Sequence, residues 1–255
     1  MNLLFVLGLL LAVAAAVRST WSPCGVSMLS VITPLQEQGR GNRFRATALW
    51  FLLGATVGGA MLGGLMAVLA AGWKGLGASV EEALAITTFA TLVAVVSDGK
   101  LFGFQLPGHD RQVNERWLDQ YRSWVYGGGF GWQIGVGFAT YIMTAGLYLL
   151  VLVAAVGASI SGALILGTVF GLVRGLAVFA AREVSSLAAL NDLHRRFEQW
   201  RQPVRKITIG VIALIGLIAG LAAGSPLALM GVVAVAAASV AAVRGERETS
   251  YVLAR

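Results

Sequence analysis

Long runs of hydrophobic residues, separated by short polar stretches, extend over the whole chain. Several runs hold about 18 residues or more, the length that an α-helix needs to cross the bilayer core. The pattern therefore predicts an all-α integral membrane protein with about seven transmembrane helices. The apolar segments span about residues 3–36, 46–72, 80–98, 130–156, 160–181, 206–224 and 226–243.

The first apolar segment is too long for one straight crossing, because an α-helix rises about 1.5 Å per residue. It contains Pro23, and proline removes a backbone donor and clashes with the preceding helical turn. We expect the helix to break near Pro23. No basic n-region precedes this run, so it is expected to stay in the mature membrane domain rather than to form a signal peptide. The last two segments are separated only by Gly224-Ser225-Pro226, which indicates a tight helical hairpin.

Two groups of three crossings predict an internal repeat within one polytopic domain of residues 1–255. The first repeat spans about residues 3–98 and the second about residues 130–224, with an extra helix at about residues 226–243. An odd number of crossings in each repeat inverts the second relative to the first. Small residues in the second apolar segment predict close helix packing. These glycines are Gly54, Gly58, Gly59, Gly63 and Gly64.

Two polar stretches have the spacing of amphipathic helices. In residues 110–125 and 184–200, apolar side chains recur every three or four positions, with basic residues between them. Basic amphipathic helices that contain Trp and Phe lie in the headgroup region of a membrane. We therefore expect both stretches to anchor to the membrane surface. Docking of a protein partner is the alternative.

The composition and charge support membrane insertion. Of 255 residues, 57% are hydrophobic and only 12% are charged, whereas soluble domains carry about 25% charged residues. The net charge of +7 does not indicate nucleic-acid binding, because the basic residues follow the expected loops. With the N-terminus outside, sixteen Lys and Arg residues fall in inside loops and one, Lys74, falls outside. Since basic loops stay in the cytoplasm, we predict a multi-pass protein of the cytoplasmic (inner) membrane, with its C-terminus inside and the lipid bilayer as partner.

Ser22-Pro23-Cys24-Gly25 is the strongest candidate for a chemical site. A thiol at a helix break lies next to unpaired amides and to the positive end of the following helix. Arg18, about one and a half turns earlier, would also favour the reactive thiolate of Cys24. The alternative is that Cys24 is a small buried hydrophobic residue beside a kink. As the one cysteine in the chain, it cannot form an intramolecular disulfide.

These residues resemble the first repeat of the CcdA/DsbD membrane domain family. The resemblance covers about residues 10–181 and rests on Ser22-Pro23-Cys24, the polar basic turn Gly39–Arg45, a glycine-rich second helix and the stretch Gly131–Phe138. It implies electron transfer from cytoplasmic thioredoxin to thiols outside the membrane, including those of cytochrome c maturation. It also implies a thioredoxin-like partner.

The chain departs from that family in the second repeat, where the second Pro-Cys falls on Thr140-Tyr141. A dithiol relay needs two thiols, and the second thiol is absent. Prolines that follow the two motifs in the family are replaced here by Ser27, Ser30 and Thr144. The resemblance therefore implies a divergent single-cysteine member in which Cys24 acts together with Pro23 and Arg18.

Hydroxyl side chains form a second candidate site. Thr140 and Thr144 are four residues apart, so they would share a helix face, with Tyr141 beside them. Facing the first repeat across the interface, they would line a polar midplane pocket for a small solute. The alternative is that they form hydrogen bonds between helices. The first-repeat members of this set are Ser22, Ser27 and Ser30.

Two charged residues interrupt the apolar helices. Arg174 is a functional candidate because intramembrane charges are costly, although its side chain could also reach the interface by snorkelling. Asp98 is expected on the same side and could pair with it. His109 and His194 have no metal-ligand spacing, so no metal site is predicted. No cofactor is predicted either.

Three functions are compatible with these features, and whether the protein is an enzyme stays open. The leading hypothesis is assistance in thiol redox or maturation of exported redox proteins. The second is a small-solute or ion transporter that uses the hydroxyl-lined pocket. The third is a structural subunit, with another membrane subunit as partner.

The predicted topology places residues 37–45 and 182–205 in the cytoplasm, because each misplaced basic residue would have to be translocated. Cysteines introduced at Gln38 and Gln202 in a Cys24→Ser background are expected to resist a membrane-impermeant thiol reagent added to intact cells. Labelling of both from outside would contradict the orientation.

Overall fold

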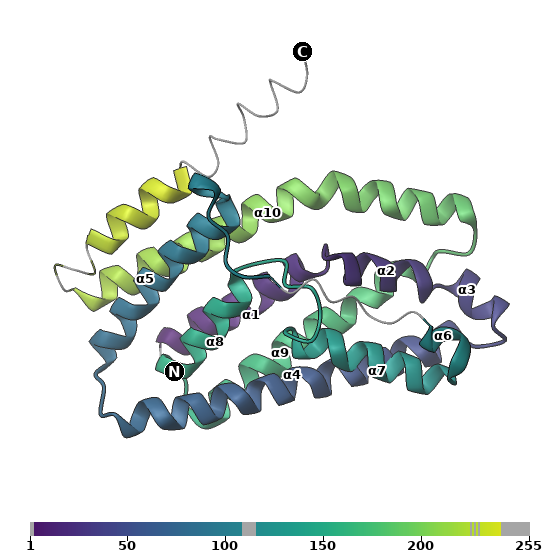
Figure 1. The fold of residues 1–255 in the computed structure, drawn as a ribbon, viewed down its shortest axis with the longest axis horizontal. Coiled ribbons are helices and arrows are strands. Elements are labelled where there is room, and N and C mark those ends of the chain that lie inside the picture. The colour runs from purple at the N-terminus through teal and green to yellow at the C-terminus, as the bar shows by residue number, and fades with distance from the viewer. Residues whose placement is uncertain (1–2, 109–115, 225, 227, 229, 241–255) are drawn as a thin grey trace, which may run out of the picture.

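The computed structural model describes residues 3–108, 116–224, 226, 228 and 230–240, and within them every regular element is a helix (Figure 1). The elements are α1 (Leu3–Ser19), α2 (Pro23–Val31), α3 (Pro34–Gly39), α4 (Phe44–Gly75), α5 (Val80–Gly99), η1 (Leu101–Gly103), α6 (Trp117–Gln120), α7 (Ser123–Val136), α8 (Gly146–Gly157), α9 (Ile160–Leu176), η2 (Ala177–Ala181) and α10 (Leu187–Ala223).

The described residues contain four helices that are long and apolar enough to cross a membrane. They are α4, α5 up to Asp98, α9 with η2, and α10. The pair α1 and α2, bent by 66°, makes a fifth if it is counted as one span. The all-helical membrane class is thus confirmed, whereas seven crossings are not. The predicted span 130–156 is divided between α7 and α8. Of the helix expected at 226–243, the structure describes a continuous helical stretch at Met230–Val240.

The break predicted near Pro23 is present. Thr20, Trp21 and Ser22 separate α1 from α2, and Pro23 takes the first position of the new helix, where no amide is needed. The Ser22 hydroxyl accepts a hydrogen bond of 3.2 Å from the amide of Gly25. A Cβ at Gly25 would overlap the carbonyl of Thr20. Local sequence therefore fixes both the end of α1 and the start of α2.

A second break lies between α7 and α8 and was not expected. α7 ends at Val136, and Gly137 follows with φ of 79°, a conformation that favours glycine. The chain becomes helical again only at Gly146. The prediction that Thr140 and Thr144 share a helix face is therefore wrong, because this segment is irregular.

The amphipathic stretch 184–200 is not a separate surface helix. It forms the first half of α10, which continues through Pro203 into the apolar half without a break. Its apolar side packs on the first break, where Trp21 stacks on Phe197 with ring centres 5.0 Å apart. In the other stretch, residues 109–115 lie outside the described residues and only Trp117–Gln120 forms a short helix before α7.

The long helix α4 packs against both α7 and α9 (Figure 1). Glycines make this contact close: a Cβ at Gly59 would overlap the carbonyl of Gly167 in α9, and one at Gly58 would overlap the carbonyl of Trp132 in α7. The packing role predicted for Gly54, Gly58, Gly59 and Gly63 is confirmed. Gly64 differs, since none of the described atoms lies within 4 Å of a Cβ built there.

We expect Gly59→Ala to lower the stability of the protein in detergent by about 1–3 kcal/mol, because α4 and α9 must separate to admit the methyl group. Thermal unfolding of the purified protein measures the effect. Gly64→Ala is the matched control on the same helix, and it should leave stability unchanged or slightly raised because alanine favours helix. Equal losses for both variants would contradict close packing at Gly59.

Candidate functional site

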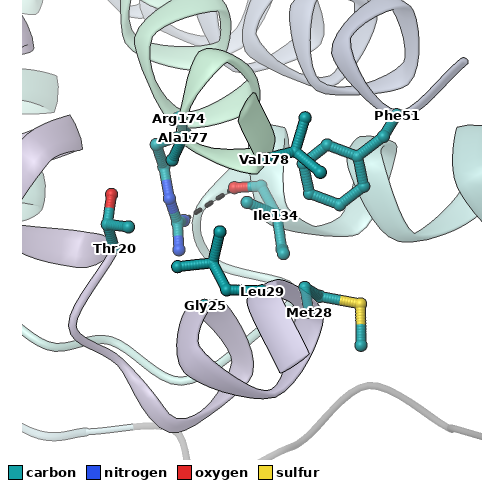
Figure 2. Close-up of a pocket in the computed structure, with 9 residues that line it drawn as sticks. All are labelled: Thr20, Gly25, Met28, Leu29, Phe51, Ile134, Arg174, Ala177 and Val178. Carbon is teal, nitrogen blue, oxygen red and sulfur yellow. Dashed lines mark hydrogen bonds between the residues drawn. The ribbon is translucent and has the colours of Figure 1, made fainter. Parts of the chain in front are cut away.

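Arg174, in the last turn of α9, lies inside the protein at both helix breaks (Figure 2). Only 3% of its surface is exposed. Its Nη1 donates a hydrogen bond of 2.6 Å to the carbonyl of Ile134, in the last turn of α7. Its Nη2 donates one of 3.4 Å to the carbonyl of Ser19, the last residue of α1. One cation therefore joins two helix ends that are distant in sequence.

Each of the two carbonyls also accepts a backbone amide of the following turn, that of Gly137 at Ile134 and that of Ser22 at Ser19, and Arg174 is the second donor to each. The last carbonyls of a helix have no partner within it and carry the negative end of its dipole. In hydrocarbon, each backbone polar group must be satisfied within the protein. A buried guanidinium supplies both hydrogen-bond donors and positive charge, so Arg174 stabilises the ends of α1 and α7 together.

Two of the sequence-based interpretations of Arg174, snorkelling and pairing with Asp98, are wrong. It does not snorkel to the interface, because its guanidinium turns inward to Ile134 and Ser19. It forms no ion pair with Asp98 within the described part of the chain. Asp98 instead accepts hydrogen bonds from the Thr144 hydroxyl and, at 2.7 Å, from the amide of Ala145. The start of α8 lies beside Asp98 and uses this carboxylate as its cap.

A small cavity of about 10 Å³ lies beside Arg174, between α2, α7 and η2 (Figure 2). It is lined by Thr20, Gly25, Met28, Leu29, Phe51, Ile134, Arg174, Ala177 and Val178. A volume of this size holds about one water molecule. The cavity is therefore too small for an organic substrate.

Cys24 lies in an apolar cluster next to this cavity. It is 1% exposed and belongs to a group of buried residues that includes Met28, Phe51 and Phe130. The neighbouring Ser22 and Pro23 begin α2, as described above. The thiol thus lies between this apolar cluster and the charge of Arg174.

The six hydroxyl residues do not form one midplane pocket. Ser30 donates a hydrogen bond of 2.8 Å to the carbonyl of Val26 and lies 2.7 Å from Nε2 of His194. Ser27 is half-buried on α2. Thr140 is fully buried, and its hydroxyl has no hydrogen-bond partner among the residues described. The structure thus separates these side chains into different surroundings.

A larger polar cavity, of about 400 Å³, brings four predicted residues together. Arg18, Asp98, Tyr141 and Thr144 all line it. It lies where α5 ends, beside the end of α1 and the irregular segment before α8. Arg18 therefore faces this cavity and Asp98.

Three further basic residues line the same cavity: Lys100, Arg201 and Arg205. The guanidinium of Arg205 donates hydrogen bonds of 3.0 Å and 2.8 Å to the carbonyl of Asp98. It thereby fixes α10 to the end of α5, much as Arg174 fixes α9 to α1 and α7. The sequence analysis placed these basic residues in inside loops without relating them to a cavity.

Glu37 is a buried acid that the sequence analysis missed. Its carboxylate, with no exposed surface, accepts hydrogen bonds from the Tyr126 hydroxyl (2.7 and 2.8 Å), the Thr47 hydroxyl (2.5 Å) and Arg40 Nη1 (3.1 Å). Burial and the nearby carboxylate raise the pKa of Tyr126 to about 12, so Tyr126 remains a donor at neutral pH. A Glu–Arg pair three residues apart was the available signal, but such pairs are usually exposed.

The described residues contain no group of three or more His, Cys, Asp or Glu side chains that could hold a metal ion. His194 contacts Ser30, whereas His109 lies outside the described residues. A third cavity, of about 420 Å³, has a mostly apolar lining: Phe44, Arg45, Leu49, Phe179, Arg182 and Glu183.

Comparison with known proteins gives a consistent set of relatives. The methylamine utilization protein MauF of Paracoccus denitrificans is 33% identical over 177 residues, which cover 66% of this chain and 60% of that protein. MauF of Paracoccus versutus is 32% identical over 183 residues, covering 68% and 63%. MauF of Methylorubrum extorquens is 30% identical over 201 residues, covering 78% and 67%. No family model and no solved structure matches the chain.

The chain belongs to the MauF family. It spans about 60% of the length of the Paracoccus relatives that it matches. The assignment to the CcdA/DsbD family is therefore wrong. The roles that this assignment implied are wrong as well: cytochrome c biogenesis, thiol–disulfide exchange and binding of a thioredoxin-like partner. The names of the MauF relatives do not support the transporter or the structural-subunit alternative either.

The misleading signal was Ser22-Pro23-Cys24. In this MauF family member, Ser22 caps α2 and Pro23 occupies its first position, so the motif has a sufficient explanation in helix initiation. Cys24 follows as a core residue. A capping hydroxyl and a proline at the first position favour the start of a helix in any protein, whether or not a reactive thiol follows.

We expect Arg174→Met to destabilise the MauF family member by about 3 kcal/mol, since two buried carbonyls would lose a charged donor. Thermal unfolding in detergent should shift downward by on the order of 10 °C. Arg182→Gln, which removes an exposed arginine that pairs with its exposed neighbour Glu183, is the control and should have little effect.

The double variant Asp98→Asn/Arg174→Met separates the observed arrangement from the pair expected from sequence. Because the two side chains use different partners, their losses should add to within about 0.5 kcal/mol. A double variant that is more stable than the sum predicts would show that they interact directly.

Proposed function

We propose that this chain acts in methylamine utilization as an integral membrane protein. The observation that carries the proposal is the similarity to methylamine utilization proteins MauF from several bacteria, at 30–33% identity over 173–201 residues. Lipid-exposed apolar helices in the described structure agree with a role in the membrane.

The architecture that we propose for this role is the inverted repeat. Each half begins with an interrupted helix, α1–α2 in one and α7–α8 in the other, and Arg174 contacts both interruptions. The following helices correspond as α4 with α9 and α5 with α10, and each of these pairs packs together (Figure 1). Sixteen basic residues in inside loops support a cytoplasmic membrane location with the N-terminus outside.

The working site that we propose is the large basic cavity, because the cavity at Arg174 is too small for a substrate. Arg174 then serves to hold the broken helices in position rather than to react. The buried position of Cys24 agrees with a function that needs no thiol chemistry.

Deletion of the gene in its source organism tests this function. Growth with methylamine as the sole nitrogen source should be lost, whereas growth with ammonium and the same carbon source should be unchanged. Re-expression of the full-length chain should restore growth on methylamine. Normal growth of the deletion strain on methylamine would overturn the proposal.

Two variants refine the same experiment. Cys24→Ala should restore growth on methylamine as well as the unaltered chain does, because Cys24 is buried in an apolar cluster. Arg174→Met should restore it poorly, with less protein in the membrane. Loss of growth in Cys24→Ala at a normal protein level would show that the thiol is required.

A further inference from the structure

The segment between α7 and α8 has backbone amides that need a hydrogen-bond acceptor. None of the amides of residues 138–144 donates a hydrogen bond to an acceptor in the described part of the chain. Bonding resumes at Ala145, whose amide donates to Asp98, and at Gly146, whose amide donates to the Thr144 hydroxyl. An amide that is left unpaired in hydrocarbon is costly. The amides of residues 138–144 therefore need water.

Helix α8 is too short to cross the bilayer core. Its 12 residues measure about 18 Å at about 1.5 Å per residue, whereas the core is about 30 Å thick. With the turn at residues 157–159 on the outer side, the segment before Gly146 lies at membrane depth. Irregular backbone at that depth is stable only where protein covers it or where it lines a water-filled cavity. The lack of protein acceptors for residues 138–144 favours the second case.

The large cavity lies along this irregular segment. Its walls include Tyr141 and Met143 from the segment. Asp98 also lines the cavity, and Arg18 and Arg205 interact with its charge. Walls that carry hydroxyl groups and charges of both signs are stable in contact with water, and costly in contact with hydrocarbon. A volume of about 400 Å³ holds several water molecules.

Exposed residues of the predicted cytoplasmic loops line the same cavity. Lys100 and Gln202 are both exposed and both belong to its walls. Arg201, next to Gln202, has a side chain that is 46% exposed. The positive-inside asymmetry predicts that these loops face the cytoplasm. The cavity thus joins the predicted cytoplasmic surface to the irregular segment.

We infer that the large cavity is a water-filled vestibule, open to the cytoplasm, that reaches the break between α7 and α8. Water in this vestibule hydrates the amides of residues 138–144. Solutes that reach the break are therefore small and water-soluble and come from the cytoplasm, whereas hydrophobic molecules from the lipid phase do not enter. This class of ligand rests on the proposed working site, but the hydration of the cavity does not.

Cysteine accessibility in the full-length chain tests this inference. Met143→Cys and Tyr141→Cys, each in a Cys24→Ala background, are treated in inside-out membrane vesicles with a small, charged, membrane-impermeant methanethiosulfonate. Both should be modified at rates within about tenfold of that of Gln202→Cys at the exposed end, since access and thiolate fraction set the rate. The matched control is Val57→Cys, on the exposed apolar face of α4 and outside the cavity lining. It should react about 100-fold more slowly, because a thiol in hydrocarbon stays protonated and only the thiolate reacts.

A bulky reagent distinguishes a cavity from an open surface. A maleimide with a long polyethylene glycol chain should modify Gln202→Cys but not Met143→Cys, because a cavity of about 400 Å³ cannot admit it. Its reaction with both would place the segment on the surface and overturn the cavity. Modification of Met143→Cys and Tyr141→Cys by the small reagent no faster than Val57→Cys would show that the segment is dry and overturn the inference.

The side of entry is tested with the same variants in intact cells. Met143→Cys should resist the small reagent added from outside, and modification from that side alone would overturn the cytoplasmic opening. None of these results depends on growth with methylamine, so the vestibule and the proposed function can fail separately.

Discussion

The interior of this protein depends on one guanidinium that neutralises two helix ends. A helix that stops within a membrane leaves carbonyls that neither water nor lipid can satisfy. Here α1 stops at Ser19 and α7 stops at Val136, and Arg174 bonds to a carbonyl of each. Each carbonyl also accepts a backbone amide of the following turn, and the buried arginine adds a charged donor to both. The end of α5 repeats this arrangement with Arg205.

Close helix packing is what allows Arg174 to reach both ends. α9 carries Gly167, Gly171 and Gly175 along its contact with α4, and a Cβ at any of them would overlap or press on α4. These glycines bring the backbone of α9 near α4 while α4 also holds α7. Because glycine has no side chain, α9 can approach α4 closely, and this close approach places Arg174 near the ends of α1 and α7. Without lipid-driven association, such close approach is a main source of helix affinity.

The sequence predicted those parts of the fold that have local causes. Apolar length indicated the helices, Pro23 indicated the first break, and the glycine spacing of α4 indicated packing. The sequence did not predict the irregular segment at 137–145, because this segment contains no proline. Arg174 was recognised as an intramembrane charge, but its partners are backbone carbonyls, which have no signature in sequence. Glu37 was missed because its burial depends on Thr47 and Tyr126, which come from other helices.

The unbroken course of α10 has a mechanical consequence. At about 1.5 Å per residue its 37 residues measure about 55 Å, well beyond the hydrocarbon thickness of about 30 Å. Its first half therefore forms a rigid arm outside the bilayer core. That arm contacts the break between α1 and α2 through Trp21, whose indole N–H donates to the carbonyl of Phe197, and contacts the end of α2 through Ser30 and His194. A force that tilts the arm would therefore be transmitted to the break between α1 and α2.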